Sequence, residues 1–382
     1  MTAQVVDLTY PKTFERYRLT YGFSWDNHYH GLLGFELRNL EKELSNELTA
    51  QLQNKNYSFY QIEADETNSK IIILGNCRVF HSVIDEIKNL KEVQLILEKC
   101  LNNFENYDSI NYQIKGRDFN FNTPVVMGIL NVTPDSFSDG GRYFTPEKAA
   151  EHGIRMIDLG ADIVDIGGES SRPGADPVST DEELKRVIPV IQKIILERPS
   201  AIISIDTYKK AVALEALQNG AVIINDISGL KNDPKILEVA KKYKASLVIM
   251  HMLGNPKTMQ NNPEYENVVE EIYDFLYAQS ALAQSYDIDN IFIDPGIGFG
   301  KTVEHNLEII RRLSDFKSLG FPILIGLSRK SFIGKLLELE VDSRDEATAM
   351  LEVLSIKNGA RLIRTHNIKY GIQISKLFTN FL

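Results

Sequence analysis

Cysteine and tryptophan are scarce in this chain, and long apolar runs are missing from it. Only Cys77 and Cys100 are cysteines among 382 residues, and their spacing matches neither a zinc motif nor a disulfide framework. No segment approaches the ~20 apolar residues that a membrane span needs. The first residues also lack the basic and apolar regions of a signal peptide. We therefore expect a protein of the reducing cytoplasm that does not contact a membrane.

An excess of basic residues is also missing, since the formal net charge is −10 at pH 7. Proteins that bind nucleic acids usually carry a basic face and a high isoelectric point, so we expect no nucleic-acid partner. An anionic substrate would have to be held by local cations rather than by the overall field. Hydrophobic residues make up 43% of the chain. Its length accommodates an α/β domain of ~250 residues and a second domain of roughly 100.

Residues 1–108 show a mixed pattern of helical and strand periods. Helices are expected over 35–54 and 80–104, and strands over 57–63 and 70–76. This part of the chain is therefore expected to form a small α+β domain, and its residues do not indicate a function.

The most distinctive segment of this first part is SWDNHYHG (24–31), which contains His28 and His30. Two interpretations stay open for it. The histidines could bind a metal or another ligand, or the segment could be an aromatic-rich loop that packs on the neighbouring domain. Because no third metal ligand is evident nearby, the loop is the favoured interpretation.

From residue 109 onward the pattern becomes regular. Residues 112–121 predict a hairpin that turns near Gly116. Eight short apolar runs then alternate with helical stretches, and they cover 125–130, 162–167, 201–206, 221–226, 246–250, 291–295, 322–326 and 361–366. Such runs are typical of parallel strands buried on both faces, and their number fits a (β/α)8 TIM barrel over 109–382. An open doubly wound sheet shares this alternation, but no glycine-rich dinucleotide fingerprint follows the first strand.

A polar or charged side chain stands at or near the carboxyl end of every expected strand. These side chains belong to Asn131, Asp165, Asp206, Asn225, His251, Asp294, Lys330, Arg364 and His366. One aspartate or asparagine alone could equally be a helix cap, a position that these residues favour. Eight strands that all end in this way indicate an active site, because the carboxyl ends of barrel strands meet at one mouth.

The acidic and amide members of this set suit a flat, donor-rich ring. Asp165, Asp206, Asn225 and Asp294 offer acceptors, and a carboxylate that faces an N–H/NH2 edge makes a pair of strong hydrogen bonds. An aminopyrimidinone has such an edge. The segment DPGIGFGK (294–301) contains three glycines, and we expect its backbone to lie close to the ligand.

The cationic members of the set suit phosphate. Lys330 follows the seventh expected strand, the eighth carries Arg364 and His366, and Arg172 joins them from the loop after the second strand. Several cations around one mouth fit a phosphate or a pyrophosphate. The alternative for each of them is a surface ion pair, which is worth about 0–1 kcal/mol.

Two long polar segments, 133–144 and 170–179, follow the first and second strands. Loops between a strand and its helix are usually ~2–6 residues long. The first segment contains Asp135, Asp139 and a pair of glycines. Segments of this composition are candidate lids over a reaction that must exclude water.

Together these segments resemble dihydropteroate synthase, an enzyme family of folate biosynthesis. The matching segments, in the order of the family, are MGILNVTPDSFSDGGR (127–142), DIVDIGGESSRPGA (162–175), SIDT (204–207), NDISG (225–229), DPGIGFGK (294–301), SRKS (328–331) and RTH (364–366). The first two are long and specific. The resemblance implies that the amine of p-aminobenzoate displaces pyrophosphate from 7,8-dihydropterin-6-ylmethyl pyrophosphate, which gives 7,8-dihydropteroate.

The resemblance also implies roles for individual residues. The residues expected to hold the pterin are Asp165, Asp206, Asn225, Met250, Asp294 and Lys330. The expected cofactor is Mg2+, bound at Asn131, and the leaving phosphates are expected at Arg364 and His366. The p-aminobenzoate site is expected to consist of Phe137, Ser171, Arg172, Pro173 and Ser331. The catalytic residues are then Asp139, which orders the first loop, Lys330, Arg364 and His366. The family also suggests a homodimer formed through barrel helices.

The sequence departs from the family at three places. It reads SSRPG where STRPG is usual, so Ser171 replaces a threonine, and Asn367 stands where aspartate is usual. Residues 1–108 precede the usual start of the family and carry no kinase or aldolase signature. A methyltetrahydrofolate-dependent methyltransferase remains an alternative, since such enzymes share the barrel and the acidic pterin pocket. It would not need the cations that suit pyrophosphate. A non-catalytic binding protein is a third possibility.

Overall fold

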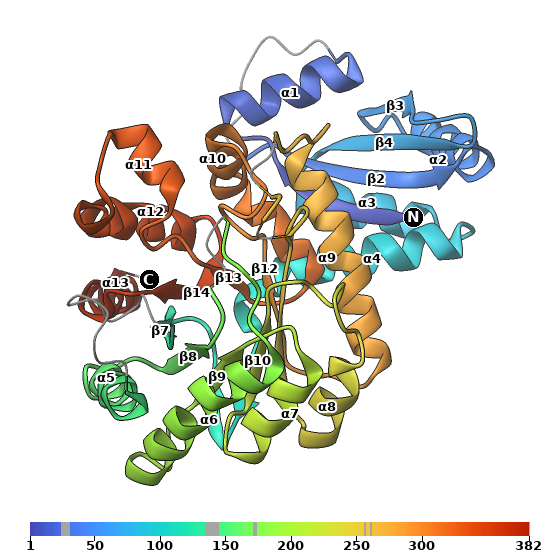
Figure 1. Cartoon of the computed structure of the whole chain (residues 1–382). Helices are drawn as coiled ribbons and strands as arrows, with labels where there is room; N and C mark the ends of the chain where they lie inside the picture. Colours follow the sequence, from blue (N-terminus) through green and yellow to red (C-terminus); the bar gives the residue numbers. More distant parts are fainter. Residues whose placement is uncertain (24–30, 134–144, 171–173, 256, 260–261, 382) are drawn as a thin grey trace. The chain divides into compact units, whose positions relative to one another are not determined.

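The computed structural model divides the chain into two compact units (Figure 1). The N-terminal unit comprises Met1–Asp108 and Arg311–Gly320, and the barrel unit comprises Ser109–Ile310 and Phe321–Leu382. The structure describes all residues except 24–30, 134–144, 171–173, 256, 260–261 and 382. The segment with His28 and His30 therefore lies outside the described residues.

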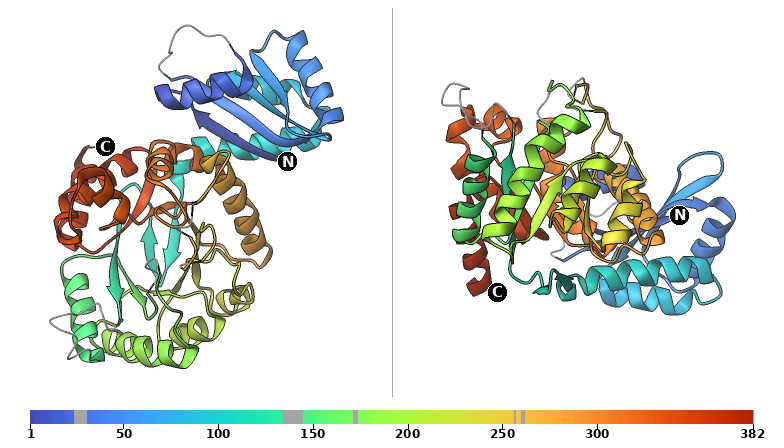
Figure 2. Two further views of the ribbon diagram at one scale, coloured as in Figure 1. Left: turned by 45° about the horizontal axis from the view of Figure 1, so that its top comes forward. Right: turned by 60° about the horizontal axis from the view of Figure 1, so that its bottom comes forward.

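Eight parallel strands form a closed barrel in the barrel unit (Figures 1 and 2). Each strand pairs with the next along the chain, and the last pairs with the first. The strands are β7 (Val125–Asn131), β8 (Ile163–Gly167), β9 (Ile203–Asp206), β10 (Ile223–Asp226), β11 (Ser246–Met250), β12 (Ile291–Asp294), β13 (Ile323–Ile325) and β14 (Ala360–Thr365). The predicted (β/α)8 barrel is confirmed, and a closed strand order is incompatible with an open doubly wound sheet.

Helices surround the strands of the barrel (Figure 2). They are α5 (Pro146–Asp158), α6 (Thr180–Glu197), α7 (Lys210–Gln218), α8 (Ile236–Tyr243), α9 (Val268–Ser285), α10 (Val303–Arg311), α11 (Ser331–Leu337), α12 (Asp345–Lys357) and α13 (Ile368–Phe381), with a short 3-10 turn η4 (Val341–Ser343). Side-chain oxygens cap α5 and α6, since Thr145 accepts from the amide of Lys148 and Ser179 from that of Glu182. These bonds satisfy amides that have no partner within the helix. Within the described ranges, no helix combines the length and apolar character that a membrane crossing requires.

A hairpin fills the amino-terminal end of the barrel. Strands β5 (Tyr112–Ile114) and β6 (Arg117–Phe119) pair antiparallel as predicted, and Gly116 takes a φ of +75° in the turn. The apolar side chains of the hairpin form a buried cluster with residues near the beginnings of the barrel strands. The Tyr112 hydroxyl also donates to the backbone carbonyl of Ile291 at 2.8 Å. Because side chains fill this end of the barrel, we expect a ligand to bind at the carboxyl end.

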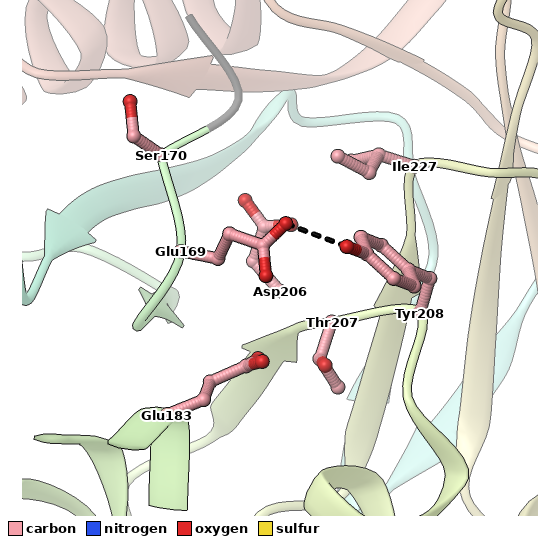
Figure 3. A pocket seen from close by; sticks show the side chains of 7 residues that line it. All are labelled: Glu169, Ser170, Glu183, Asp206, Thr207, Tyr208 and Ile227. Carbon is pink, nitrogen blue, oxygen red and sulfur yellow. Dashed lines mark hydrogen bonds between the residues drawn. The ribbon is translucent and has the colours of Figure 1, made fainter. Parts of the chain in front are cut away.

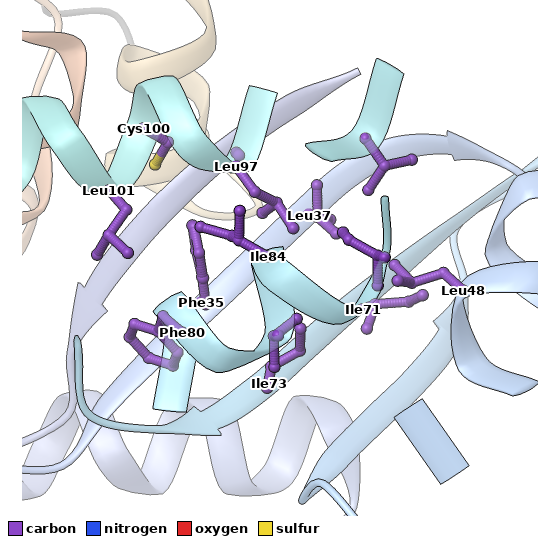
Figure 4. Packing of buried hydrophobic residues seen from close by; sticks show 14 of the residues in the cluster. Phe35, Leu37, Leu48, Ile71, Ile73, Phe80, Ile84, Leu97, Cys100 and Leu101 are labelled. Carbon is purple, nitrogen blue, oxygen red and sulfur yellow. The ribbon is translucent and has the colours of Figure 1, made fainter. Parts of the chain in front are cut away.

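The N-terminal unit is a four-stranded antiparallel sheet with helices on both faces, and the expected α+β fold is confirmed. The strand order is β1 (Thr2–Asp7), β2 (Leu33–Glu41), β4 (Asn68–Gly75) and β3 (Phe59–Glu63). The helices are α1 (Pro11–Tyr21), α2 (Lys42–Asn54), α3 (Cys77–Glu86) and α4 (Lys91–Glu105). On one face Phe35, Ile73, Phe80 and Leu97 pack together (Figure 4). A second core, which includes residues of α1, covers the other face.

Two predictions for this unit are wrong. Residues 35–54 do not form one helix, because Phe35 and Leu37 lie in β2 and the helix begins only at Lys42. Phe35 and Leu37 are two residues apart, as side chains on one face of a strand are, and both are buried in the same core. Residues 80–104 form two helices, α3 and α4, instead of one. The break lets each helix place its own apolar side chains in the core that covers the sheet.

A buried polar network ties the segment Arg311–Gly320 to the rest of the N-terminal unit. Arg312 and Asp315 are both 0% exposed, and Arg312 Nε donates to Asp315 Oδ2 at 2.8 Å. Arg312 Nη2 donates to the hydroxyl of Tyr17 in α1 at 2.8 Å. The segment forms a 3-10 helix, η3 (Leu313–Leu319), which packs against β1 and α4. Although it lies between α10 and β13 in the chain, this segment belongs to the N-terminal unit, whereas the sequence placed it in the barrel domain.

Candidate active site

Four strands bring an arginine, two carboxylates and an amide together at the carboxyl end of the barrel. Arg364 on β14 donates from Nε to Asp165 Oδ2 at 2.7 Å and from Nη2 to Asp206 Oδ2 at 2.8 Å. Asn225, the register partner of Asp206, donates from Nδ2 to Asp165 Oδ2 at 2.9 Å. Four of the expected pterin and phosphate residues are therefore linked directly to one another.

This cluster has unused capacity for a polar ligand. Asp165 is fully buried, and its Oδ1 has no hydrogen-bond partner among the described residues. Arg364 uses two of its five N–H donors on the carboxylates. One guanidinium cannot neutralise two ionised carboxylates, so the cluster retains negative charge when both are ionised. The expected phosphate residue Arg364 thus also serves the acidic pocket, a dual position that the strand-end pattern did not predict.

A second group of site residues surrounds Asp294 at the end of β12. Asp294 is 6% exposed, and its Oδ1 accepts the amide N–H of Gly296 at 2.7 Å. Met250, its register partner on β11, is buried in a cluster with Phe299. Lys330 Nζ lies 3.9 Å from the centre of the Phe299 ring, a cation–π contact. Apolar and charged surfaces are therefore combined here, as a flat polar ring requires.

Burial shifts the pKa values of the charged groups in both clusters. It raises the pKa of Asp206 to about 7, an effect that Arg364 and Lys330 oppose and Asp165 reinforces. It raises the pKa of Asp294, which Lys330 and Arg364 lower. It lowers the pKa of Lys330 to about 8 against the attraction of Asp294. Since the same two cations act on both aspartates, the acidic and basic groups surround one mouth.

The pH dependence of catalysis is expected to reflect these shifts. As the pH rises through about 7, Asp206 loses its proton and becomes a stronger acceptor, so kcat/KM should rise. As the pH rises through about 8, Lys330 loses its charge, so kcat/KM should fall again. Steady-state rates at fixed ionic strength test this expectation. A profile that stays flat between about pH 6 and pH 9 would contradict it.

Three further predicted site residues lie at the carboxyl ends of β7, β13 and β14. Asn131 ends β7 and is partly buried, and no hydrogen bond engages its side chain within the described part of the chain. His366 follows β14, and its Nδ1 lies 2.9 Å from the hydroxyl of Ser328. Ser331 is the exposed first residue of α11. The placement of all three agrees with a mouth formed by strand ends.

The remaining predicted site residues cannot be placed in this way. Phe137, Asp139, Ser171, Arg172 and Pro173 lie outside the described residues. Of the expected p-aminobenzoate site, only Ser331 is described.

The glycines of segment 294–301 serve close packing of the protein backbone. Gly296 has a φ of +71°, and a Cβ atom there would lie 1.9 Å from the carbonyl oxygen of His251, so only glycine fits. His251 does not stand alone at its strand end, because its Nδ1 lies 3.0 Å from the buried Nζ of Lys301. Lys301 Nζ also donates to the carbonyl of Phe299 at 3.0 Å. These contacts hold the segment in place beside Asp294, and sequence analysis did not foresee the role of Lys301.

A network of charged side chains beside Asp206 was also missed. Figure 3 shows a pocket there that is lined by Glu169, Ser170, Glu183, Asp206, Thr207, Tyr208 and Ile227. Lys209 Nζ lies 2.5 Å from the carboxylates of both Glu169 and Glu183. The position of Lys209, three residues after the strand-end Asp206, was the available signal.

Asn367, which departs from the family pattern, fits its surroundings. Its Nδ2 donates to Asp345 Oδ2 at 3.1 Å, and Asp345 also pairs with Arg329 at 2.7 and 2.9 Å. An aspartate at position 367 would place a second carboxylate against Asp345, where it would be repelled. The neighbouring Asp345 therefore explains why asparagine stands at position 367.

Fold and site together define a class of protein. The family model described as pterin binding enzyme matches residues 127–366, a range that contains the clustered side chains and nearly all of the barrel strands. The chain is thus a pterin-binding enzyme built on a TIM barrel.

Similar proteins narrow this class. The dihydropteroate synthase of Synechocystis sp. is 47% identical over 256 residues, which cover 66% of this chain and 88% of that protein. The solved dihydropteroate synthase of Xanthomonas albilineans with 4-aminobenzoic acid is 39% identical, with a TM-score of 0.67 over 72% of this chain and 98% of the other. The solved dihydropteroate synthase of Thermus thermophilus in complex with 6HMPPP is 33% identical, with a TM-score of 0.62. The match covers 72% of this chain and 100% of the other. The chain belongs to the dihydropteroate synthases, which are transferases of folate biosynthesis.

Proposed function

We propose that the described mouth of the barrel joins p-aminobenzoate to 7,8-dihydropterin-6-ylmethyl pyrophosphate and releases pyrophosphate. The observation that carries the proposal is the meeting of Asp165, Asp206 and Asp294 with Lys330 and Arg364 at one end of the barrel. Relatives solved with 4-aminobenzoic acid and with 6HMPPP support the choice of substrates.

The acidic pocket is suited to the donor edge of the pterin. Asp294 and Asp165 offer buried carboxylate oxygens, and Asn225 can both donate and accept. A ring N–H and an exocyclic amine that face one carboxylate form a charge-assisted pair of hydrogen bonds. Met250 supplies an apolar contact for the ring, and Lys330 supplies a donor for a ring carbonyl or nitrogen. Each of these side chains then contacts an atom of the heterocycle.

Asp294→Asn tests this part of the proposal. The substitution replaces an acceptor by an amide that can present a donor to the N–H edge of the ring, so we expect the Kd of a phosphate-free pterin to rise about 100-fold. The conservative variant Asp233→Asn, at a half-buried position in the turn before α8, serves as the control and should leave binding unchanged. Titration calorimetry measures both. Unchanged pterin affinity in Asp294→Asn would refute the assignment.

The cationic group is suited to the leaving pyrophosphate. Arg364 has N–H donors beyond those that it gives to the aspartates, and His366 and Asn131 lie at neighbouring strand ends. Mg2+ prefers oxygen ligands and is often held by few protein groups together with substrate phosphates. The amide oxygen of Asn131 fits that preference, and the described residues contain no cluster of three or more His, Cys, Asp or Glu that could hold a metal. Bound Mg2+ would neutralise charge on the pyrophosphate as it departs.

The reaction needs charge stabilisation more than it needs a protein nucleophile. An aryl amine is a weak nucleophile, and the pterin methylene can ionise because the ring delocalises the positive charge. Asp165, Asp206 and Asp294 stabilise that cation, while Arg364 and His366 stabilise the departing anion. The hydroxyl of Ser331, with Phe137, Ser171, Arg172 and Pro173, forms the p-aminobenzoate side, and Asp139 orders the first loop.

We further propose a homodimer formed through α11 and α12. Large apolar side chains are exposed in this region, namely Leu336 (46%), Leu337 (49%), Val341 (48%), Met350 (68%) and Leu354 (51%). Met350 and Leu354 are four residues apart and share one face of α12. An exposed apolar patch of this kind marks an interaction surface.

The dimer is tested by introducing charge into this patch. Met350→Asp combined with Leu354→Asp should convert a dimer to a monomer in light scattering coupled to size-exclusion chromatography. Leu196→Asp is the control, because Leu196 is 76% exposed on α6. A chain that is monomeric without substitutions, or a double variant that remains dimeric, would contradict the proposal. We also propose a place in the cytoplasm, because two cysteines in 382 residues suggest a reducing compartment.

A further inference from the structure

Lys209 connects three separate parts of the chain beside the second strand of the barrel. It precedes α7, and its Nζ donates to Glu169 Oε2 at 2.5 Å, to Glu183 Oε2 at 2.5 Å and to the backbone carbonyl of Val178 at 2.6 Å. An ammonium group has three donors, so all of them are engaged. The lysine side chain is only 17% exposed, and that of Glu183 is 1% exposed.

These acceptors lie at the two ends of one loop. Glu169 follows β8, whereas Val178 comes just before the cap of α6. Glu169 Oε2 also accepts the amide N–H of Val178 at 3.2 Å, which joins the two ends directly. Glu169 Oε1 accepts from the hydroxyl of Tyr208 at 2.6 Å (Figure 3). Both ends of the loop are thereby tied to α6 and to the beginning of α7.

Charge makes the lysine essential to this arrangement. Glu169 and Glu183 approach the same ammonium group, and without it two carboxylates would face each other in a largely buried place. Burial already raises the pKa of Glu183, and Lys209 opposes that shift. Loss of the lysine would therefore separate the two carboxylates and release the carbonyl of Val178.

We propose that Lys209 is a positioning residue for p-aminobenzoate, because it fixes both ends of the loop that carries Ser171, Arg172 and Pro173. This inference rests on the proposed function, in which these three residues form part of the p-aminobenzoate site. Lys209 itself does not contact the substrate. Its removal should impair p-aminobenzoate binding while the pterin pocket stays intact.

The test compares Lys209→Met with Lys210→Met in the full-length enzyme. Lys210 is adjacent, and among the described residues its ammonium group pairs only with Glu238, at an exposed position, so it is a matched control. We expect Lys209→Met to raise the KM of p-aminobenzoate at least about tenfold and the KM of the pterin pyrophosphate less than about threefold. Lys209→Arg should recover part of the loss, and Lys210→Met should match the unsubstituted enzyme. A general loss of structure would raise both KM values together.

Hydrogen exchange tests, independently of enzyme activity, whether Lys209 anchors the ends of this loop. In Lys209→Met, amide exchange of the peptide that spans 168–182 should become faster, while that of the barrel strands stays unchanged. Unchanged exchange would overturn the anchor, and faster exchange with an unchanged p-aminobenzoate KM would overturn its role in binding. If the unsubstituted enzyme releases no pyrophosphate, the proposed function fails. Amide exchange would still show whether Lys209 holds the ends of the loop.

A second variant keeps the test decisive if Lys209→Met does not fold. Tyr208→Phe removes the hydroxyl bond to Glu169 without changing the charge. It should raise the p-aminobenzoate KM about threefold and leave the pterin KM unchanged. Equal kinetics of Tyr208→Phe and the unsubstituted enzyme would then count against the proposal.

Discussion

Replacing Arg364 with alanine is expected to lower kcat/KM about 1,000-fold. In the structure this guanidinium bonds to Asp165 at 2.7 Å and to Asp206 at 2.8 Å, and it retains donors for the pyrophosphate. Its loss would therefore affect both halves of the substrate. The departing anion would lose a cation, and the pKa of Asp206 would rise further because Arg364 now lowers it.

Two binding measurements show which part of this effect dominates. Pyrophosphate affinity should fall most, and the affinity for a phosphate-free pterin should fall by about tenfold, because the protonated form of Asp206 is a poorer acceptor. Arg364→Lys should recover only part of the activity, since an ammonium cannot bond two carboxylates and a phosphate with the same geometry. Arg198→Ala, which removes an exposed pair with Asp158, is the control. A kcat/KM within tenfold of the unsubstituted value would contradict the role of Arg364.

Removal of residues 1–108 is expected to leave the barrel insoluble or to lower its Tm by more than about 10 °C. The reason is the segment Arg311–Gly320, whose buried Arg312 and Asp315 bond to residues that the truncation removes. Burial raises the pKa of Asp315 to about 7, and the backbone amide of Asp7 is among its partners. Truncation would strip this segment of its partners and expose the apolar side chains between them.

Complementation provides the control for the truncation. Residues 1–108 expressed as a separate chain should restore solubility to the chain that begins at residue 109, because the buried network can form between two chains. The expected result is measured by yield of soluble protein and by thermal unfolding. A truncated barrel with the Tm and activity of the full chain would show that the N-terminal unit is only an accessory.

The barrel was predictable because each strand is buried on both faces and therefore reads as a continuous apolar run. Strand ends such as Asp206 and Asn225 were then predictable as neighbours, since parallel strands in a closed barrel deliver their carboxyl ends to one place. Asp294 and Arg364 could be assigned to one mouth for the same reason. The grouping of acceptors and cations indicated a flat ring and a phosphate as ligands, whereas the reaction itself was implied by the resemblance to dihydropteroate synthase.

What the sequence could not show depends on contacts between distant segments. The strand at Phe35 and Leu37 was taken for a helix, because a stretch of leucines beyond it continues near helical spacing. The pairing of Arg364 with Asp165 joins residues 199 positions apart, so no local pattern indicates it. Lys209 is one of two adjacent lysines, and only the fold shows that it, unlike Lys210, pairs with the buried Glu183 and the partly buried Glu169. No local pattern indicates that Arg311–Gly320 belongs to the N-terminal unit, either.

The release of pyrophosphate in the presence of Mg2+ tests the central claim most directly. Purified full-length protein is supplied with 7,8-dihydropterin-6-ylmethyl pyrophosphate, with and without p-aminobenzoate, and pyrophosphate and dihydropteroate are both quantified. We predict that both products form in equal amounts and only when p-aminobenzoate is present. Absence of pyrophosphate release, or release that does not depend on p-aminobenzoate, would contradict the assignment of this barrel as a dihydropteroate synthase.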